Sequence, residues 1–358
     1  MLLDMIIVKC SSQFQNKRSN TAIFHLLKGR KSIQTQQDAF LYGLHRFYGI
    51  HKKLSKQAFQ QKVNQLCNSG YLQMQEESVI PGAKGTAFLQ KMDQYPQLYN
   101  LNGMKYINTD TIFCQRLLLL IQTLTNSCHN YFSFIPVVDS PHITGWVKNH
   151  YKRIKPKREA VLQIIHKELQ QMFERFPGGD AGIFVDCLTG FEHYGMSSYQ
   201  LAKYHNIERI DVTIVLTAIV HRILWEVEQE QATFPTLSYI MQDLTQNTKL
   251  SQSAVRTDRL LRKNYKPAEI AEMRNLKINT IYDHIVEIAL YHSNFPIDAY
   301  VSNGQHKKIV SAIRTSNSFK LKDIKNEVGD KISYFQIRLV LATHQKKSGD
   351  KIDQSGTN

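Results

Sequence analysis

Residues 266–285, KPAEIAEMRNLKINTIYDHI, constrain the fold of this chain more than any other stretch. Pro267 suits the first turn of a helix, where its missing N–H group loses no hydrogen bond. Asn275 suits a tight turn, because asparagine tolerates a positive φ better than most residues. Isoleucines then recur at 278, 281, 285 and 288, the spacing of one buried helical face. The stretch therefore predicts a short helix, a tight turn and a longer helix.

Two helices joined in this way form a helix–turn–helix unit, whose second helix presents exposed residues to base edges and phosphates. Asp283 does not suit base reading, since phosphate repels a carboxylate unless it accepts from cytosine. We therefore expect phosphate contacts with weak sequence preference. The residues expected to bind DNA, from this unit and the segment before it, are Arg256, Arg259, Arg262, Lys263, Lys266, Arg274, Lys277, Asn279, Thr280 and Tyr282.

The charge balance also favours a polyanionic partner. The chain has 45 Lys and Arg against 30 Asp and Glu, a formal net charge of +15, which indicates nucleic acid before an anionic membrane. A second basic run, KNHYKRIKPKR at 148–158, fits a solvated helix start and a phosphate-contacting patch equally well. Its cations are Lys148, Lys152, Arg153, Lys155, Lys157 and Arg158.

The expected fold is mainly α, built from tandem helix–turn–helix and winged-helix units with a small N-terminal β-hairpin wing. Apolar spacing predicts helices over 20–28 and 35–48, and Ser55 is the expected cap of a third. GYLQMQ and TAFLQ, around a turn at Pro81–Gly85, predict the hairpin. Three helices and a hairpin are typical of a winged helix.

Four regions are predicted along the chain. They are a winged-helix-like domain at 1–95, a helical middle region at 96–245 with a helix–turn–helix-like unit near 195–230, the helix–turn–helix domain at 246–345, and a disordered polar tail at 346–358.

No catalytic or metal-binding motif stands out. GRKS at 29–32 lacks the spacing of a nucleotide-binding loop, and neither HExxH nor GxSxG occurs. The five cysteines form no CxxC pair, and the fourteen histidines lack metal-ligand spacing. We expect a non-enzyme with no cofactor and no metal. The longest apolar run, 117–121, is far below the ~20 residues that span a bilayer, so a cytoplasmic or nucleoid-associated protein without a membrane partner is expected.

Residues 237–344 resemble the helix–turn–helix domain found at the C-terminus of some RecQ-type DNA helicases. The matching pieces are KPAEIAEMRNLKINTIYDHIVE and LKDIKNEVGDKISYFQIRLVLA, and Arg274 is usual in that domain. KGRKSIQTQQDAFLYGLHRFYGI and the overall length are similar to the stand-alone YpbB-like proteins of Gram-positive bacteria, typically encoded beside a RecQ-type helicase. The resemblance implies a helicase-associated role and no activity that carries over residue by residue.

Three functions follow as hypotheses. The favoured one is a non-enzymatic DNA-binding accessory protein of a RecQ-type helicase, acting in repair or recombination. The alternatives are a helix–turn–helix transcriptional regulator and a protein–protein adaptor without DNA contact. Ile324, Val328, Ile337 and Leu341 are the first candidates for the helicase-docking side, or else the core of their own subdomain.

Overall fold

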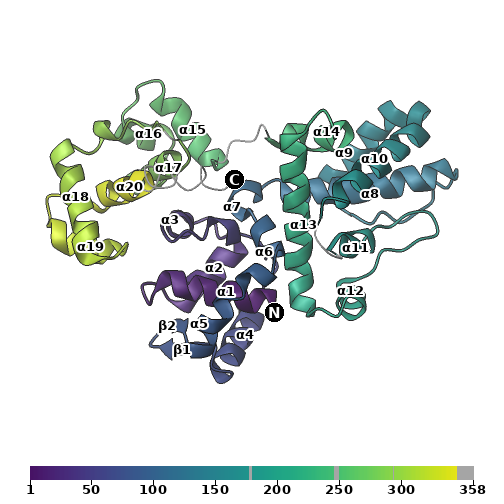
Figure 1. Ribbon diagram of the computed structural model, residues 1–358. Coiled ribbons are helices and arrows are strands. Elements are labelled where there is room, and N and C mark those ends of the chain that lie inside the picture. Colours follow the sequence, from purple (N-terminus) through teal and green to yellow (C-terminus); the bar gives the residue numbers. More distant parts are fainter. Residues whose placement is uncertain (177–179, 246–249, 293, 345–358) are drawn as a thin grey trace.

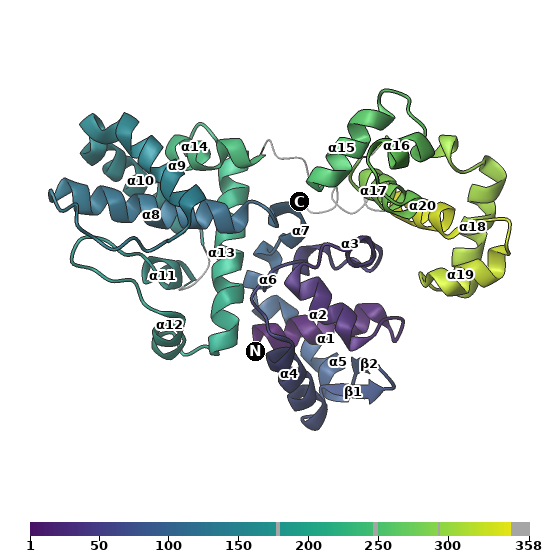
Figure 2. The same cartoon turned by 180° about the vertical axis from the view of Figure 1, so that it is seen from behind.

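A computed structural model describes residues 1–176, 180–245, 250–292 and 294–344. In these ranges the protein is mainly α-helical, with one two-stranded antiparallel sheet, so the predicted fold class is confirmed. Figure 1 and Figure 2 show three groups of helices: an N-terminal group in purple and blue, a middle group in teal, and a C-terminal group in green and yellow. The predicted tail at 346–358 lies outside the described residues.

The N-terminal group holds the sheet and the first helices. Its elements are α1 (Leu2–Phe14), α2 (Asn20–Lys28), α3 (Ile33–Leu41), η1 (His45–Phe47), α4 (Lys56–Asn68), β1 (Leu72–Gln75), β2 (Ser78–Pro81), α5 (Ala83–Leu89), η2 (Met92–Gln94), α6 (Gln97–Asn100) and α7 (Gly103–Tyr106).

Helix α1 was not expected from the sequence. Its residues from Met5 to Val8 are all fully buried, so the helix is apolar on several faces and shows no amphipathic period. Asp211 of the later helix α13 (Arg209–Gln229) caps its first turn, because both carboxylate oxygens accept backbone N–H groups, from Leu2 and Leu3, at 2.9 Å.

The predicted hairpin exists, but its predicted second strand is wrong. Strand β1 pairs with β2 in the register Leu72↔Pro81, and residues 86–89 lie in α5 instead. The turn contains Glu76, with a φ of 52°, and neither glycine nor proline. The prediction relied on glycine and proline and therefore placed the turn too late in the chain. Gly85 begins a close approach of α5 to β1: a Cβ there would lie 2.0 Å from the carbonyl oxygen of Tyr71.

The predicted helix over 35–48 is also shorter than expected. Helix α3 ends at Leu41, and Gly43, with a φ of 63°, turns the chain before η1. Ser32 and Ser55 cap α3 and α4 by accepting hydrogen bonds from the backbone N–H groups of Thr35 and Ala58.

The middle group is built on two long helices. Its elements are α8 (Asp110–Cys128), α9 (Pro141–Ile154), η3 (Lys155–Lys157), α10 (Arg158–Phe173), α11 (Asp180–Val185), α12 (Ser198–Tyr204), α13 and α14 (Pro235–Thr245). Helices α12 and α13 flank a turn in which Asn206 has a φ of 51°, so the segment near 195–230 is a helix, a turn and a longer helix.

A fully buried arginine joins three helices of the middle group. Arg116 on α8 donates two hydrogen bonds to the carboxylate of Asp243 on α14, at 2.6 and 2.9 Å. Its guanidinium also lies 4.3 Å from the ring centroid of Trp146 on α9. Because this charge is paired and stacked, it fixes α8, α9 and α14 relative to one another.

The C-terminal group contains the segment from which the sequence analysis started. Its elements are α15 (Gln252–Leu261), α16 (Pro267–Met273), α17 (Ile278–Tyr291), η4 (Ile297–Ala299), α18 (Asn303–Ser316), α19 (Leu321–Val328) and α20 (Tyr334–His344). The predicted last pair, LKDIKNEV and YFQIRLVLATH, coincides with α19 and α20.

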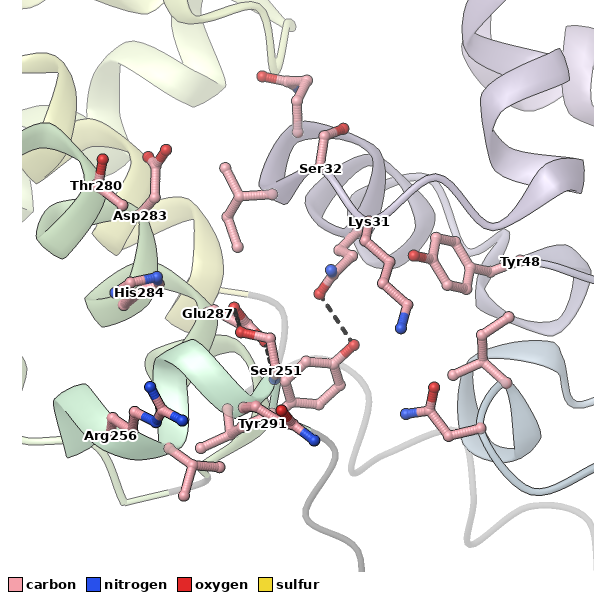
Figure 3. Close-up of a pocket in the computed structure, with 18 of the residues that line it drawn as sticks. Lys31, Ser32, Tyr48, Ser251, Arg256, Thr280, Asp283, His284, Glu287 and Tyr291 are labelled. Carbon is pink, nitrogen blue, oxygen red and sulfur yellow. Dashed lines mark hydrogen bonds between the residues drawn. The ribbon is translucent and has the colours of Figure 1, made fainter. Parts of the chain in front are cut away.

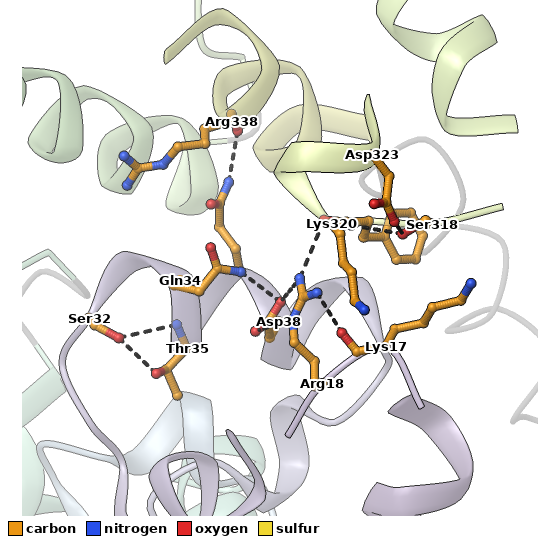
Figure 4. A network of polar contacts seen from close by, with 12 residues as sticks. Lys17, Arg18, Ser32, Gln34, Thr35, Asp38, Ser318, Lys320, Asp323 and Arg338 are labelled. Carbon is orange, nitrogen blue, oxygen red and sulfur yellow. Dashed lines mark hydrogen bonds and ion pairs between the residues drawn. The ribbon is translucent and has the colours of Figure 1, made fainter. Parts of the chain in front are cut away.

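The C-terminal group packs against α3 of the N-terminal group. The side-chain amide of Gln37 donates to the carbonyl oxygen of Arg338 at 2.7 Å, and the Tyr291 hydroxyl donates to Gln36 at 3.1 Å. Arg18, held by a two-bond ion pair with the buried Asp38, donates to a carbonyl of the segment before α19 (Figure 4). These contacts place α17 and α20 beside α3, and the segment before α19 beside Arg18.

Candidate nucleic-acid interface

Helices α16 and α17 form the helix–turn–helix unit that the sequence predicts. Ile270 and Ala271 are buried where the two helices cross, and Asn275 adopts a φ of 50° in the turn. The side chain of Glu269 accepts a hydrogen bond from the backbone N–H of Lys266 at 2.7 Å, which supports the start of α16. Ile281, Ile285 and Ile288 are buried as one stripe of α17.

The guanidinium of Arg274 is bound inside the unit. It donates to the carbonyl oxygen and the hydroxyl of Ser253, each at 2.9 Å, and to the hydroxyl of Thr257. Burial, together with the neighbouring Arg256, lowers the pKa of Arg274. These bonds tie α15 to the turn, so Arg274 supports the fold of the unit, and its contact with DNA stays a prediction.

Two further residues of α17 are engaged by α20. The ring of Tyr282 stacks on Phe335 with centroids 4.1 Å apart, and Asp283 forms an ion pair with Arg338 at 2.7 Å. The face that presents Tyr282 and Asp283 is therefore already in contact with protein. Lys277 and Asn279 remain exposed at the start of α17, and Thr280 is half-buried.

The expected basic residues of α15 and the following segment lie on the surface. Arg256, Arg259, Arg262, Lys263 and Lys266 are exposed. Arg262 pairs with Asp258 at 2.8 Å within the same helix. The side chains of Arg256, Arg259, Lys263 and Lys277 form no hydrogen bond or ion pair with any residue that the structure describes. Arg256, Arg259 and Lys263 together border a shallow cavity of about 610 Å³ that also reaches Arg274.

The second basic run lies on the middle group, where α9 meets α10 through η3. Lys148, Lys152, Lys155 and Lys157 are exposed, while Arg158 is half-buried. Arg153 donates to the Tyr239 hydroxyl at 2.9 Å. In both views α13 and α14 lie between this run and α15 (Figures 1 and 2), so the two basic regions are separate surfaces.

A larger cavity lies between the helix–turn–helix unit and the N-terminal group. It measures about 960 Å³, and Figure 3 shows its two walls, with Arg256, His284 and Glu287 on one side and Lys31 and Tyr48 on the other. Burial, with Arg274 nearby, lowers the pKa of His284. Sequence reasoning did not select Lys31, although it belongs to the GRKS stretch that was examined as a nucleotide-binding loop.

Among the described residues, no group of three or more His, Cys, Asp or Glu side chains is arranged to hold a metal ion. Within the same ranges, no helix combines the length and apolar character needed to cross a bilayer.

Two comparisons with known proteins give matches. A family model described as a helix-turn-helix domain matches residues 253–341, which run from α15 into α20. Protein YpbB of Bacillus subtilis (strain 168) is 30% identical to this chain over 342 residues, covering 94% of this chain and 96% of that protein. No solved structure matches the chain.

Proposed function

The chain belongs to the YpbB family and carries a helix-turn-helix domain, and from this we propose that it is a non-enzymatic DNA-binding protein that assists a RecQ-type helicase in repair or recombination. The observation that carries the DNA-binding part is the group of exposed, unpaired cations beside α16 and α17: Arg256, Arg259, Lys263 and Lys277. Such cations contact phosphates and position a protein on DNA.

Weak sequence preference follows from what remains free on α17. Tyr282 and Asp283 contact α20, so they do not reach a base edge without leaving their partners. Only Lys277, Asn279 and Thr280 stay accessible at the start of the helix. Three accessible residues are too few to specify a long DNA sequence through base contacts, so phosphate binding is favoured.

Because the sequence carries no nucleotide-binding loop of the GxxxxGK[ST] form, we assign ATP hydrolysis and strand separation to the partner. In the proposed function this chain supplies DNA contact to a motor that is a separate protein.

The helicase contact is not assigned to the C-terminal helical pair. Ile324, Val328, Ile337 and Leu341 are all buried, so they form the core of their subdomain, which was the alternative role given to them.

An exposed apolar loop between α8 and α9 supports a protein partner instead. Ile135 is 89% exposed and Phe132 is 61% exposed. The buried amide of Gln122 fixes the loop, since it donates to the carbonyl oxygen of Ile135 at 3.0 Å and accepts from the N–H of Val137 at 2.8 Å. Tyr131 and Val137 of the same loop are also exposed, and neighbouring apolar side chains exposed to water mark an interaction site.

The charge of this loop argues against DNA as its ligand. No Lys or Arg occurs between Arg116 and Lys148 in a chain whose net charge is +15. We therefore assign the loop of residues 129–140 to the helicase, and the basic surface of α15 to α17 to DNA.

Co-purification tests the proposed function. The tagged chain is isolated from its own cells in the presence of nuclease, so that DNA cannot bridge two proteins, and the RecQ-type helicase is sought in the eluate. The purified chain is also added to that helicase unwinding forked DNA. Absence of the helicase together with no effect on unwinding contradicts the helicase part. Footprinting on random-sequence and forked DNA separates this function from transcriptional regulation, because a regulator protects one sequence.

A further inference from the structure

The cavity of about 960 Å³ has walls from two distant parts of the sequence. Thr280, Asp283, His284 and Glu287 of α17 line one wall, with Arg256 and Arg259 of α15. Lys31, Ser32 and Gln34 at the start of α3 line the other. The hydrogen bond from Tyr291 to Gln36, drawn in Figure 3, joins the walls. The cavity is therefore a cleft whose width is set by direct contact between the two groups.

The cleft holds spare positive charge. Lys31, Arg256 and Arg259 are exposed, and none of them forms a hydrogen bond or ion pair with the residues described. The two carboxylates in the lining are already engaged. Asp283 pairs with Arg338 at 2.7 Å, and Glu287 accepts from the backbone N–H and the hydroxyl of Ser251 at 2.5 and 3.0 Å. The unused donors in the cleft thus include three cations, which suits an anionic ligand.

The size of the cleft favours a ligand narrower than a double helix. Its volume lies in the range of small-molecule sites, about 300–1,000 Å³. A helix that reads duplex DNA needs an open face, because it enters a groove about 12 Å wide between two phosphate backbones. The face of α17 that carries Thr280, His284 and Glu287 lies across the cleft from α3. This face of α17 is therefore not open to a duplex groove, and we expect one extended strand as the ligand.

The lining also offers one ring to the bases of a strand. Single-stranded nucleic acid is bound by a positive groove together with aromatic side chains. Tyr291 is half-buried and lines the cleft with the apolar side chains of Val255 and Ile112. The hydroxyl of Tyr291 is already bonded to Gln36, so the ring is held in place. Tyr48 also borders the cleft, but it is only 2% exposed and serves as part of the wall.

A continuous path leads from the cleft to the basic surface of α15 to α17. Arg256 and Arg259 line both the cleft and the neighbouring cavity of about 610 Å³, which continues to Lys263. We propose that the cleft binds a single strand of DNA by its phosphates, between Lys31 on one side and Arg256 and Arg259 on the other. The inference rests on the proposed DNA binding and specifies the form of DNA that is bound.

The test compares one strand with a duplex on the full-length chain. Fluorescence anisotropy is measured with a labelled oligothymidine of about 12 nucleotides, within the usual site size for such grooves, and with a hairpin duplex. Lys31→Glu reverses the charge in the cleft, and Lys31→Arg keeps it. Lys91→Glu is the matched control, since Lys91 is an exposed lysine of the same group that does not line the cleft.

Lys31→Glu is expected to weaken oligothymidine binding about tenfold and duplex binding less than about twofold. Lys31→Arg should bind like the unaltered chain, and Lys91→Glu should change either affinity by less than about twofold. Circular dichroism confirms that each variant is folded. If Lys31→Glu and Lys91→Glu weaken oligothymidine binding equally, the inference about the cleft is wrong. The proposed binding of DNA by this chain is not contradicted by that result.

Two other outcomes are distinct. If inorganic phosphate displaces the oligonucleotide more strongly than sodium chloride of equal ionic strength, the cleft is a small-anion site and the inference is wrong. If the unaltered chain binds neither the oligonucleotide nor the duplex at low salt, the proposed DNA binding itself fails.

Discussion

Asp283 of α17 and Arg338 of α20 form an ion pair with an N–O distance of 2.7 Å. From the sequence, Asp283 was the residue of the second helix least compatible with DNA. The structure gives it a partner on its own subdomain, so its charge is offset before DNA approaches. The same pair holds α17 against the helix that carries the contact between Arg338 and Gln37 of α3.

Removal of this carboxylate should improve DNA binding. Asp283→Asn frees the charge of Arg338 near the cleft, so affinity for DNA is expected to rise a few-fold at low salt. The free energy of unfolding should fall by only about 0.2–1 kcal/mol, because both side chains are partly exposed. Anisotropy titration and urea denaturation measure the two effects. A fall in DNA affinity without loss of structure contradicts the view that Asp283 opposes phosphate.

The basic surface of α15 to α17 should control the salt dependence of DNA binding. Changing Lys263, Lys266 and Lys277 together to alanine removes up to three phosphate contacts. The slope of log K against log salt should then become shallower by about 2.7, and all sequences should be affected alike. Lys307 and Lys308 on α18 are exposed lysines outside this surface, and their alanine variants are the control. If the slope is unchanged in the triple variant, these three lysines do not contact phosphate.

The apolar loop should be needed for the helicase and not for DNA. Ile135→Asp introduces a charge at an 89% exposed apolar position and is expected to abolish co-purification with the helicase. DNA affinity should stay within about twofold, since no cation of the basic surface changes. Ile164→Asp is the matched control, because Ile164 on α10 is 44% exposed and lies outside the loop. Equal recovery of the helicase with both variants argues against the loop.

Stability should decline as the pH falls below about 6.5. Burial lowers the pKa of His221 from its usual value of 6.5, despite the opposing effect of Asp110. The unfolded chain therefore binds a proton at a higher pH than the folded chain. The stabilisation is complete above about 6.5 and is lost as the pH falls toward the folded pKa. His51, His150 and His284 shift in the same direction, with burial as the main cause.

Urea denaturation between about pH 5.5 and 7.5 measures this effect. The Nδ1 atom of His221 accepts a hydrogen bond from the backbone N–H of Asn102 at 3.0 Å. His221→Asn retains an acceptor for this N–H group. The variant should be less stable at neutral pH and show a shallower pH dependence than the unaltered chain. An unaltered slope would mean that His221 does not titrate on unfolding.

Local signals predicted the amphipathic helices well. Helices α19 and α20 coincide with the segments expected, because α19 has one apolar stripe and a glycine-containing turn divides it from the apolar run of α20. Helix α1 was missed, since burial on several faces removes the periodicity on which such predictions depend. The second strand was misplaced because the turn at Glu76 has no characteristic residue.

The candidate site was predictable only where it is local in sequence. Arg256, Arg259 and Lys263 lie close to the helix–turn–helix unit along the chain and were selected. Lys31 was not, because only the packing of α17 against α3 brings it opposite Arg256. Arg274 was selected for its charge, and no pattern shows that its guanidinium is bound by Ser253 and Thr257. Contacts between remote segments are set by tertiary packing and produce no periodic pattern in the sequence.

The cap that Asp211 provides to α1 has a consequence for biosynthesis. The carboxylate and the N–H groups of Leu2 and Leu3 are separated by 209 and 208 residues. A ribosome therefore releases the first helix long before its capping group exists. During that interval α1 can already pack against α2, α4, α5 and β2, but the part of α1 that contacts α13 lacks its final partner. The cap and the contact with α13 thus form only after translation has passed α13, and a nascent chain halted before that point should expose this part of α1 to chaperones.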